Sequence, residues 1–171
     1  MKILITGAAG FIGFHLSNYL SNKRHQVYGL DNFSSLSFKT QKLRRKILKN
    51  NKKINLKKVD LKNFKFLLKS FENIKIDLVI HLAGFKSIIE SINNPSLYRT
   101  NNFIYTQKLV DVMLKNDCRK IIFSSSASVY GYPEYLPIDE KHPINPLNPY
   151  SKSKADIEFF LAKLVKNYDF Q

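Results

Sequence analysis

The chain has 171 residues and a formal net charge of +15, and 44% of its residues are hydrophobic. This apolar content excludes a disordered or fibrous chain, and the length suits a single domain, residues 1–171, with a buried core. No apolar run approaches the roughly 20 residues of a membrane span, and the start reaches Gly7 before a signal-peptide core forms, so we expect a cytoplasmic protein without membrane contact. The single cysteine, Cys118, cannot form an internal disulfide and belongs to no metal-binding motif, so no metal site is predicted.

Strand and helix patterns alternate along the chain. Residues 2–6 predict a strand, 11–22 a helix and 26–30 a second strand, and a basic helix precedes a third strand over 54–59. Asn63 can cap a helix that ends near residue 71, and a fourth strand covers 76–82. Asn94 and Pro95 open a helix to about residue 115, a fifth strand covers 119–125, and a proline-rich loop over 133–149 precedes a helix over 150–168. This order predicts the α/β class, with a Rossmann-like, doubly wound parallel sheet of five strands in the order 3-2-1-4-5.

The positive charge is concentrated between Asn32 and Val59, where ten basic residues occur without an acid. Leu36, Leu43, Ile47 and Leu48 recur there at helical spacing, which predicts a solvated basic helix with one apolar edge. Such a surface attracts phosphate groups, but neither a nucleic-acid-binding module nor interleaved aromatic residues accompany it. We therefore do not expect nucleic acid as a partner.

The first predicted strand and its helix are joined by a G-x-x-G-x-x-G loop of Gly7, Gly10 and Gly13. Gly7 permits the tight turn, Gly10 allows a pyrophosphate to approach the backbone, and Gly13 permits close packing of helix on strand. Asp31 closes the second strand 18 residues after Gly13, where a carboxylate can accept hydrogen bonds from both ribose hydroxyls. The acid would repel a 2'-phosphate, so the pattern favours NAD over NADP. A glycine turn without ligand, and Asp31 as a turn residue, remain the alternatives.

Tyr150 and Lys154 form a Y-x-x-x-K pattern that places phenol and ammonium on one helix face. The spacing alone says little, because the same pair occurs at Tyr19 and Lys23. The serines from Ser124 to Ser126, however, leave the carboxyl end of the fifth strand, where open α/β sheets bind ligands. A phenol is a poor base at neutral pH unless a neighbouring cation stabilises the phenolate, which Lys154 can do. The structural alternatives are a satisfied phenol at a helix start, a solvated lysine and a serine at a strand end.

These motifs occur in the order typical of the extended short-chain dehydrogenase/reductase family, the NAD-dependent epimerases and dehydratases, and the chain resembles that family from its first residue to its last. The resemblance implies NAD as cofactor and catalytic roles for Ser126, Tyr150 and Lys154. The implied cofactor-binding positions are Gly7, Gly10, Phe11, Ile12, Gly13, Asp31, Asn32, Asp60, Leu61, Leu82, Ala83, Gly84, Lys86, Asn101, Tyr150 and Lys154. Lys86 as an ordinary surface lysine stays an alternative, and His81 is expected to be a packed histidine at a strand end.

Within the family, the pattern is most similar to the epimerases that interconvert UDP-glucose and UDP-galactose by transient oxidation at C4, which implies a UDP-hexose substrate. The dehydratases of the family carry an acidic pair after the serine or threonine at this strand end, whereas this chain has Ala127 and Ser128. Another nucleotide-sugar epimerase, a dehydratase or a decarboxylase remains open, as does an NAD-binding or structural remnant without turnover.

Family members are about twice as long, so the resemblance implies that the C-terminal substrate-binding domain is absent from this chain. A fragment, a truncated gene and a domain completed by another polypeptide all stay open. The fifth strand, including Ile121, Ile122 and Phe123, would then form an exposed edge. We expect either self-association into a homo-oligomer or pairing with a complementing C-terminal polypeptide.

Overall fold

The computed structural model describes residues 1–34, 37–167 and 169–171, and it describes the backbone but not the side chain of Phe38. The chain divides into two compact units. The first contains residues 1–83, 108–124 and 171, and the second contains residues 84–107 and 125–170. Among the described residues, no helix is both long and apolar enough to cross a membrane.

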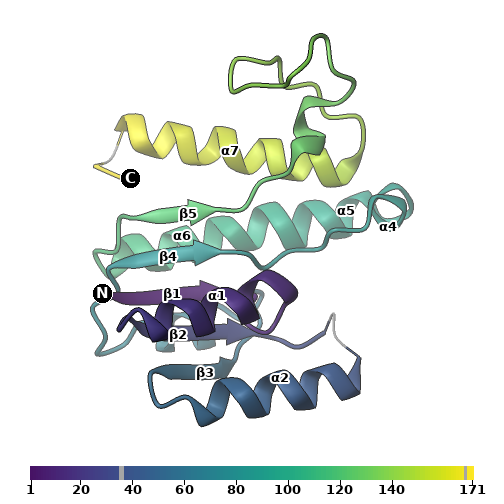
Figure 1. Ribbon diagram of the computed structural model, residues 1–171. Helices are drawn as coiled ribbons and strands as arrows, with labels where there is room; N and C mark the ends of the chain where they lie inside the picture. Colours follow the sequence, from purple (N-terminus) through teal and green to yellow (C-terminus); the bar gives the residue numbers. More distant parts are fainter. Residues whose placement is uncertain (35–36, 168) are drawn as a thin grey trace. The chain divides into compact units, whose positions relative to one another are not determined.

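The first unit is built on a parallel sheet of five strands, β1 (Lys2–Thr6), β2 (Gln26–Asp31), β3 (Ile54–Lys58), β4 (Leu78–His81) and β5 (Ile121–Phe123). Their order is β3-β2-β1-β4-β5, as predicted (Figure 1). In the register of the central pairs, Thr6 lies beside Leu30 on one side and beside His81 on the other. The carboxyl ends of β1, β2 and β4 therefore lie at one edge of the sheet, the edge that binds ligands in open α/β folds.

Three helices and part of a fourth complete the first unit: α1 (Phe11–Asn22), α2 (Phe38–Asn50), α3 (Phe64–Lys69) and α6 (Tyr105–Lys115) from Lys108 onward. In Figure 1, α1 and α2 lie in front of the strands and α6 lies behind them. Ile3 and Ile5, alternate residues of β1, point to the same face of the sheet. They pack with Ala8, Val27 and Leu48 in a buried core cluster. Phe14, Leu16 and Leu20 of α1 pack against this cluster, and so do Leu56, Leu78 and Leu82.

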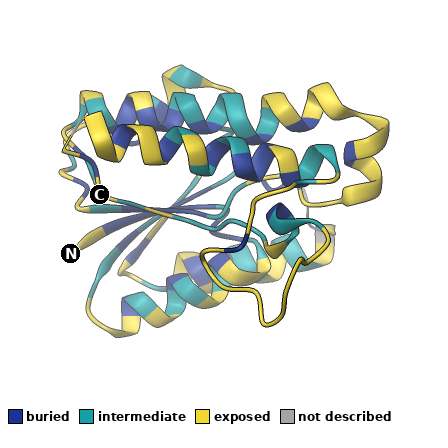
Figure 2. Ribbon diagram, turned by 90° about the horizontal axis from the view of Figure 1, so that it is seen from above, coloured by how far each residue is buried: buried dark blue, intermediate teal, exposed yellow. Residues whose placement is uncertain are grey.

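The second unit contains α4 (Ile88–Asn93), α5 (Pro95–Tyr98), a π-helix η1 (Arg99–Ile104), a 3-10 helix η2 (Ala127–Tyr130) and α7 (Pro149–Asn167). The long helix α7 packs against α4, α5, η1 and η2. Residues 131–148 form a loop of mostly exposed residues (Figure 2), in the place of the predicted proline-rich loop. Tyr168, the predicted end of the last helix, lies outside the described residues.

The helix expected over 95–115 has these bounds, but its residues 99–104 form a π-helix, η1, between α5 and α6. The short helix α4 that precedes it was not predicted. Asn94 is the N-cap of α5 without a side-chain cap hydrogen bond, whereas Asn63 caps α3 by accepting from Phe66 N, as expected. The π-helical stretch has a tertiary cause, because it carries the buried Asn102, whose side chain bonds to residues distant in sequence.

The predicted apolar edge of the basic helix was largely wrong. Leu48 is fully buried, but Leu43 is 60% exposed and Ile47 is 40% exposed. Leu36 lies outside the described residues. The inward positions are taken by Arg44 and Arg45, whose guanidinium groups lie over aromatic rings. Periodicity of apolar residues alone cannot reveal such a face.

Candidate functional site

The predicted site residues fall into two sets, one in each unit. The first unit holds the glycine loop with Phe11 and Ile12, the strand-end residues Asp31, Asn32, Asp60 and Leu61, and the pair Leu82 and Ala83. The second unit holds Gly84, Lys86, Asn101, Ser126, Tyr150 and Lys154.

The glycine loop is built so that two of its glycines cannot be replaced without rearrangement. Gly7 has a φ of +70°, and a Cβ there would lie 2.9 Å from the backbone N of Ala83. A Cβ on Gly13 would lie 2.1 Å from the carbonyl O of Gly7, so only glycine lets α1 start this close to the loop. A Cβ on Gly10 would meet a single neighbour within 4 Å, Gly7 O at 3.1 Å.

Gly10 is the N-cap of α1, and no side chain caps this helix start. The amides of the first turn have no acceptor within the helix by geometry, and they lie at the positive end of the helix dipole. Phe11 and Ile12, the first residues of the turn, are 69% and 58% exposed. This helix start can therefore receive an anionic group.

Asp31, at the end of β2, is held by two backbone amides. Its Oδ2 accepts from Ala9 N at 2.9 Å and its Oδ1 from Phe33 N at 2.7 Å, so the carboxylate lies directly beside the glycine loop. A carboxylate offers about four lone-pair sites, so two stay available for hydroxyl donors.

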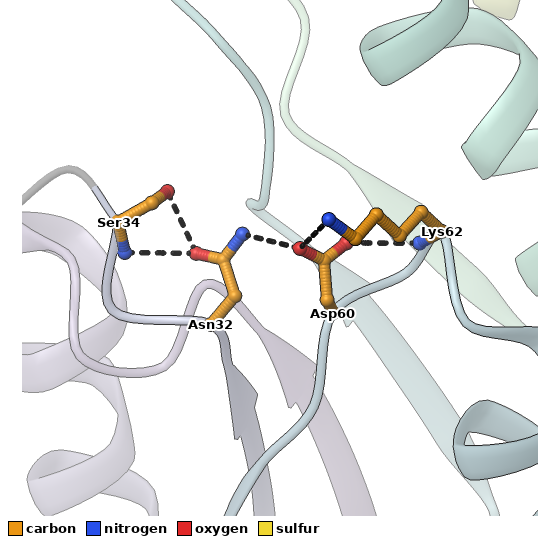
Figure 3. Close-up of polar contacts among 4 residues, drawn as sticks. All are labelled: Asn32, Ser34, Asp60 and Lys62. Carbon is orange, nitrogen blue, oxygen red and sulfur yellow. Dashed lines mark hydrogen bonds and ion pairs between the residues drawn. The ribbon is translucent and has the colours of Figure 1, made fainter.

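A polar chain links the segments that follow β2 and β3, as Figure 3 shows. Asn32 Nδ2 donates to Asp60 Oδ2 at 3.1 Å, and Asn32 Oδ1 accepts from both the amide and the hydroxyl of Ser34. Asp60 Oδ1 accepts from Lys62 N at 3.0 Å, and Lys62 Nζ lies 3.8 Å from Asp60 Oδ2. Leu61, between the last two residues, is half-buried.

Beyond the glycine loop, Thr6 and His81 connect β1 to β4. Thr6 Oγ1 and His81 Nδ1 are 2.6 Å apart, and Thr6 Oγ1 also accepts from Ala83 N at 3.2 Å. The His81 ring is buried and stacks on Phe123, which confirms that it is a packed histidine. Leu82 and Ala83 are half-buried beside Gly7, and their backbone lies so close that it leaves no room for a Cβ at that position.

In the second unit, α7 carries the predicted catalytic pair. Asn148 caps this helix by accepting from Ser151 N at 2.9 Å, and Pro149 begins it. The ring of Tyr150 meets that of Tyr98 edge-on at 6.5 Å. Lys154, one turn later, is buried, and burial lowers its pKa to about 8 while the charge of Glu158 opposes the shift.

Ser126 caps η2, the 3-10 helix that packs against α7. Its Oγ accepts from Ser128 N at 3.2 Å and lies 2.8 Å from Ser128 Oγ. The preceding serine, Ser125, donates from its hydroxyl to a carboxylate oxygen of Glu158. Glu158 therefore holds Ser125 while also lying one turn after Lys154.

Asn102, which sequence reasoning missed, organises the segment after Gly84. Its Oδ1 accepts from Phe85 N at 2.8 Å, and its Nδ2 donates to Phe85 O and to Ser153 Oγ of α7, both at 3.0 Å. The predicted neighbour, Asn101, is half-buried and donates to Asn102 Oδ1. A Cβ on Gly84 would lie 3.2 Å from Asn102 Oδ1 and 3.8 Å from Lys154 Nζ, so this turn lies against the buried lysine. Lys86, two residues on, is exposed.

The parallel sheet, its crossovers and the glycine loop at the end of β1 define a Rossmann-type α/β protein. The Y-x-x-x-K helix and the strand-end serines place it among the extended short-chain dehydrogenases/reductases. The chain belongs to the GDP-mannose 4,6 dehydratase family, whose pattern matches residues 4–171.

Several curated relatives and solved structures to which the chain is similar are named as 4-epimerases. The chain is 42% identical to a UDP-glucose 4-epimerase of Pisum sativum over 167 residues, which cover 96% of this chain and 48% of that protein. The UDP-Glc/GlcNAc 4-epimerase of Campylobacter jejuni superposes with a TM-score of 0.89 at 34% identity, over 99% of this chain and 51% of that one. UDP-glucose 4-epimerase of Bifidobacterium longum, solved with NAD+ and UDP, gives a TM-score of 0.89 at 35% identity, over 100% of this chain and 51% of that one. The chain thus spans about half the length of the relatives that it matches.

Proposed function

We propose that this chain is the NAD-binding and catalytic half of a nucleotide-sugar 4-epimerase that acts on a UDP-hexose. Residues 1–171 form the NAD-binding domain in this proposal, and the substrate-binding domain lies outside them. The observation that carries the proposal is a combination of three residues in the second unit. Tyr150 lies at the start of α7, the buried Lys154 follows one turn later, and Ser126 is the N-cap of the 3-10 helix packed against α7. The epimerases among the relatives support the same reaction class.

The residues of the first unit fit a dinucleotide. The uncapped start of α1 offers amides to the pyrophosphate, and the lone pairs that remain on Asp31 suit ribose hydroxyls. NAD would be held by the positions that the resemblance implies, and when bound it supplies a hydride acceptor and donor.

Side chains of the second unit then transfer the proton of the substrate hydroxyl. Tyr150 takes the proton of the substrate hydroxyl through its phenolic oxygen, and the cationic Lys154 stabilises the phenolate that results. Ser126 Oγ, with its Ser128 partner, donates to the same substrate oxygen. On return of the hydride to the opposite face of the sugar, Tyr150 gives the proton back.

Elimination of water, the reaction of a 4,6-dehydratase, lacks its acid here. The positions after Ser126 are Ala127 and Ser128, and Ser128 is bonded to Ser126. Epimerisation requires no acid at those positions, so it is the better match.

The proposal extends to location and partners. A cytoplasmic protein fits the lone buried thiol of Cys118, which pairs with no other cysteine. The edge strand β5, with Ile122 54% exposed, offers a surface for a second copy or for a complementing polypeptide.

The test is turnover of UDP-galactose by the purified chain, with and without the C-terminal half of a curated relative supplied as a separate polypeptide. We expect conversion to UDP-glucose in at least one mixture, and Tyr150→Phe should reduce its rate by about 10²- to 10⁴-fold. Tyr19→Phe, at the chance Y-x-x-x-K pair of α1, is the matched control and should keep full activity. NAD binding without turnover in either mixture would favour a non-catalytic remnant, and turnover that survives Tyr150→Phe would remove Tyr150 from the mechanism.

A further inference from the structure

The peptide group between Ala9 and Gly10, in the middle of the glycine loop, has both of its polar atoms bound. Its N–H, on Gly10, donates to Gly7 O at 3.0 Å. Its carbonyl, on Ala9, accepts from Nη1 of Arg44 at 2.9 Å. A peptide group held at both ends cannot rotate about its axis without losing both bonds.

The peptide group before it is held by a charge of the opposite sign. Ala9 N donates to Asp31 Oδ2 at 2.9 Å. Two successive peptide groups of the loop are thus fixed from outside, one by a carboxylate at the end of β2 and one by a guanidinium of α2. Charge-assisted hydrogen bonds of this kind are roughly twice as strong as neutral ones.

Arg44 is itself held in place by aromatic rings of α1. Its guanidinium carbon lies 5.5 Å from the ring centroid of Phe14 and 6.0 Å from that of Phe11, and the side chain is half-buried. Leu48, one turn further along α2, is fully buried in the core cluster, which sets the face of α2 that points inward. The arginine therefore reaches the loop from a rigid element.

The neighbouring inward residues of α2 hold the segment after β2 in the same way. Gln41 Nε2 donates to Phe33 O, and the Arg45 guanidinium lies 4.6 Å from the Phe33 ring centroid. Phe33 has a φ of +61°, a conformation that needs such support in a residue other than glycine.

We propose that Arg44 is a positioning residue that fixes the Ala9–Gly10 peptide group and thereby keeps the following amides of α1 aimed at the phosphates of the bound dinucleotide. The inference rests on the proposed function in so far as NAD is the ligand. It assigns a specific role to one cation of the basic segment. Unlike Arg44, the lysines of α2 are exposed.

The test compares Arg44→Met, which keeps an unbranched stem but removes the donor, with Lys46→Met, an exposed residue of the same helix that loses the same charge. Calorimetry or NMR titration measures the dissociation constants of NAD, of ADP, which carries the pyrophosphate, and of adenosine, which carries no phosphate. We expect Arg44→Met to raise the dissociation constants of NAD and ADP by about tenfold and that of adenosine by less than about twofold. The lost hydrogen bond comes from a charged group and supports only the part of the loop that faces the pyrophosphate. Lys46→Met should change none of the three by more than about twofold.

Two further measurements separate positioning from charge and from general loss of structure. Arg44→Lys keeps a cationic donor on a flexible stem, so its affinity for NAD should fall between those of wild type and Arg44→Met. Amide hydrogen exchange of Gly10 without nucleotide should be faster in Arg44→Met than in Lys46→Met, while the amides of β1 and β2 exchange equally in both.

The outcomes keep the two claims apart. A wild-type chain that binds neither NAD nor ADP overturns the proposed function and this inference with it. A wild-type chain that binds both, with an Arg44→Met variant that binds them equally well or that loses adenosine to the same degree, overturns the inference alone.

Discussion

At the scale of single residues, two carboxylates at neighbouring strand ends have different surroundings. Asp31 accepts only from backbone amides in the bonds described above, and these amides orient it without neutralising its charge. Asp60 instead bonds the side-chain amide of Asn32 and lies near the ammonium of Lys62. The backbone amides thus orient Asp31 beside the glycine loop, whereas Asp60 joins the segments that follow β2 and β3.

Replacing Asp31 tests that difference. Asp31→Asn keeps the side-chain shape but removes the charge that would repel a 2'-phosphate, so the ratio of NAD to NADP affinity should fall by about tenfold or more. Calorimetric titration with both dinucleotides measures the ratio. Asp111→Asn, an exposed residue of α6, is the control and should leave the ratio unchanged. An unchanged ratio in Asp31→Asn would remove this residue from cofactor selection.

The lowered pKa of Lys154 predicts a pH dependence of the free energy of unfolding. Burial lowers its pKa to about 8 from the ordinary 10.5, so between these values the unfolded chain binds more protons than the folded chain. Stability therefore rises with pH in that window, and the part due to Lys154 is lost as pH falls through about 8. Urea unfolding should show wild type gaining about 1 to 2 kcal/mol more than Lys154→Met between pH 8 and pH 9.5. Equal gains in the two proteins would mean that Lys154 is solvated.

At the scale of elements, the spacing of apolar residues and the glycine loop predicted the five strands, their order and the bounds of β1 and α1. The strands β4 and β5 are shorter than the predicted ranges 76–82 and 119–125. These features depend on local patterns and on the right-handedness of crossovers, both of which a sequence carries. The π-helix η1 and the inward face of α2 depend instead on partners far away in sequence. Asn102 is buried because of Phe85 and Ser153, and Arg44 points inward because of Ala9 and Phe14.

The residues of the candidate site also fall into those that the sequence predicted and those that depend on distant partners. The motif residues Gly7, Asp31 and Lys154 could be named from the sequence, because each stands at a fixed place relative to a strand or a helix. The supporting residues Arg44, Asn102 and Glu158 could not, because no spacing rule connects them to the residues that they hold. The helical spacing of Gln41, Arg44 and Leu48 was the one sequence signal for the inward face of α2. It can be recognised only if long polar side chains, and not apolar ones alone, are counted as candidates for an inward position.

Two glycines of the loop should behave differently when replaced. Gly13→Ala places a Cβ 2.1 Å from Gly7 O, so we expect a loss of stability of several kcal/mol, measured by urea unfolding. Gly10→Val has a single close neighbour, so this variant should stay folded while its side chain excludes the pyrophosphate and NAD binding is lost. The reverse pattern, a stable Gly13→Ala or a Gly10→Val that binds NAD normally, would refute the proposed place of the loop.

At the scale of the whole molecule, the features of the chain fit a protein that gains stability from its ligand. The last strand of the described sheet, β5, has three residues, and its outer edge is met by Gln171, which bonds to Ile121 N and to Arg119 O at 2.8 Å each. This pairing covers only the start of the edge. A formal charge of +15 adds self-repulsion that an anionic dinucleotide would relieve in part.

The central claim is therefore tested most directly by the melting temperature of the 171-residue chain with and without NAD. At 100 times the dissociation constant, bound NAD should stabilise the folded chain by about 2.7 kcal/mol and raise its Tm by roughly 5 to 10 °C. NADP should raise it less, although it carries more negative charge, because Asp31 repels the 2'-phosphate. A Tm that is indifferent to NAD, or that rises more with NADP as charge neutralisation alone would require, would contradict the account.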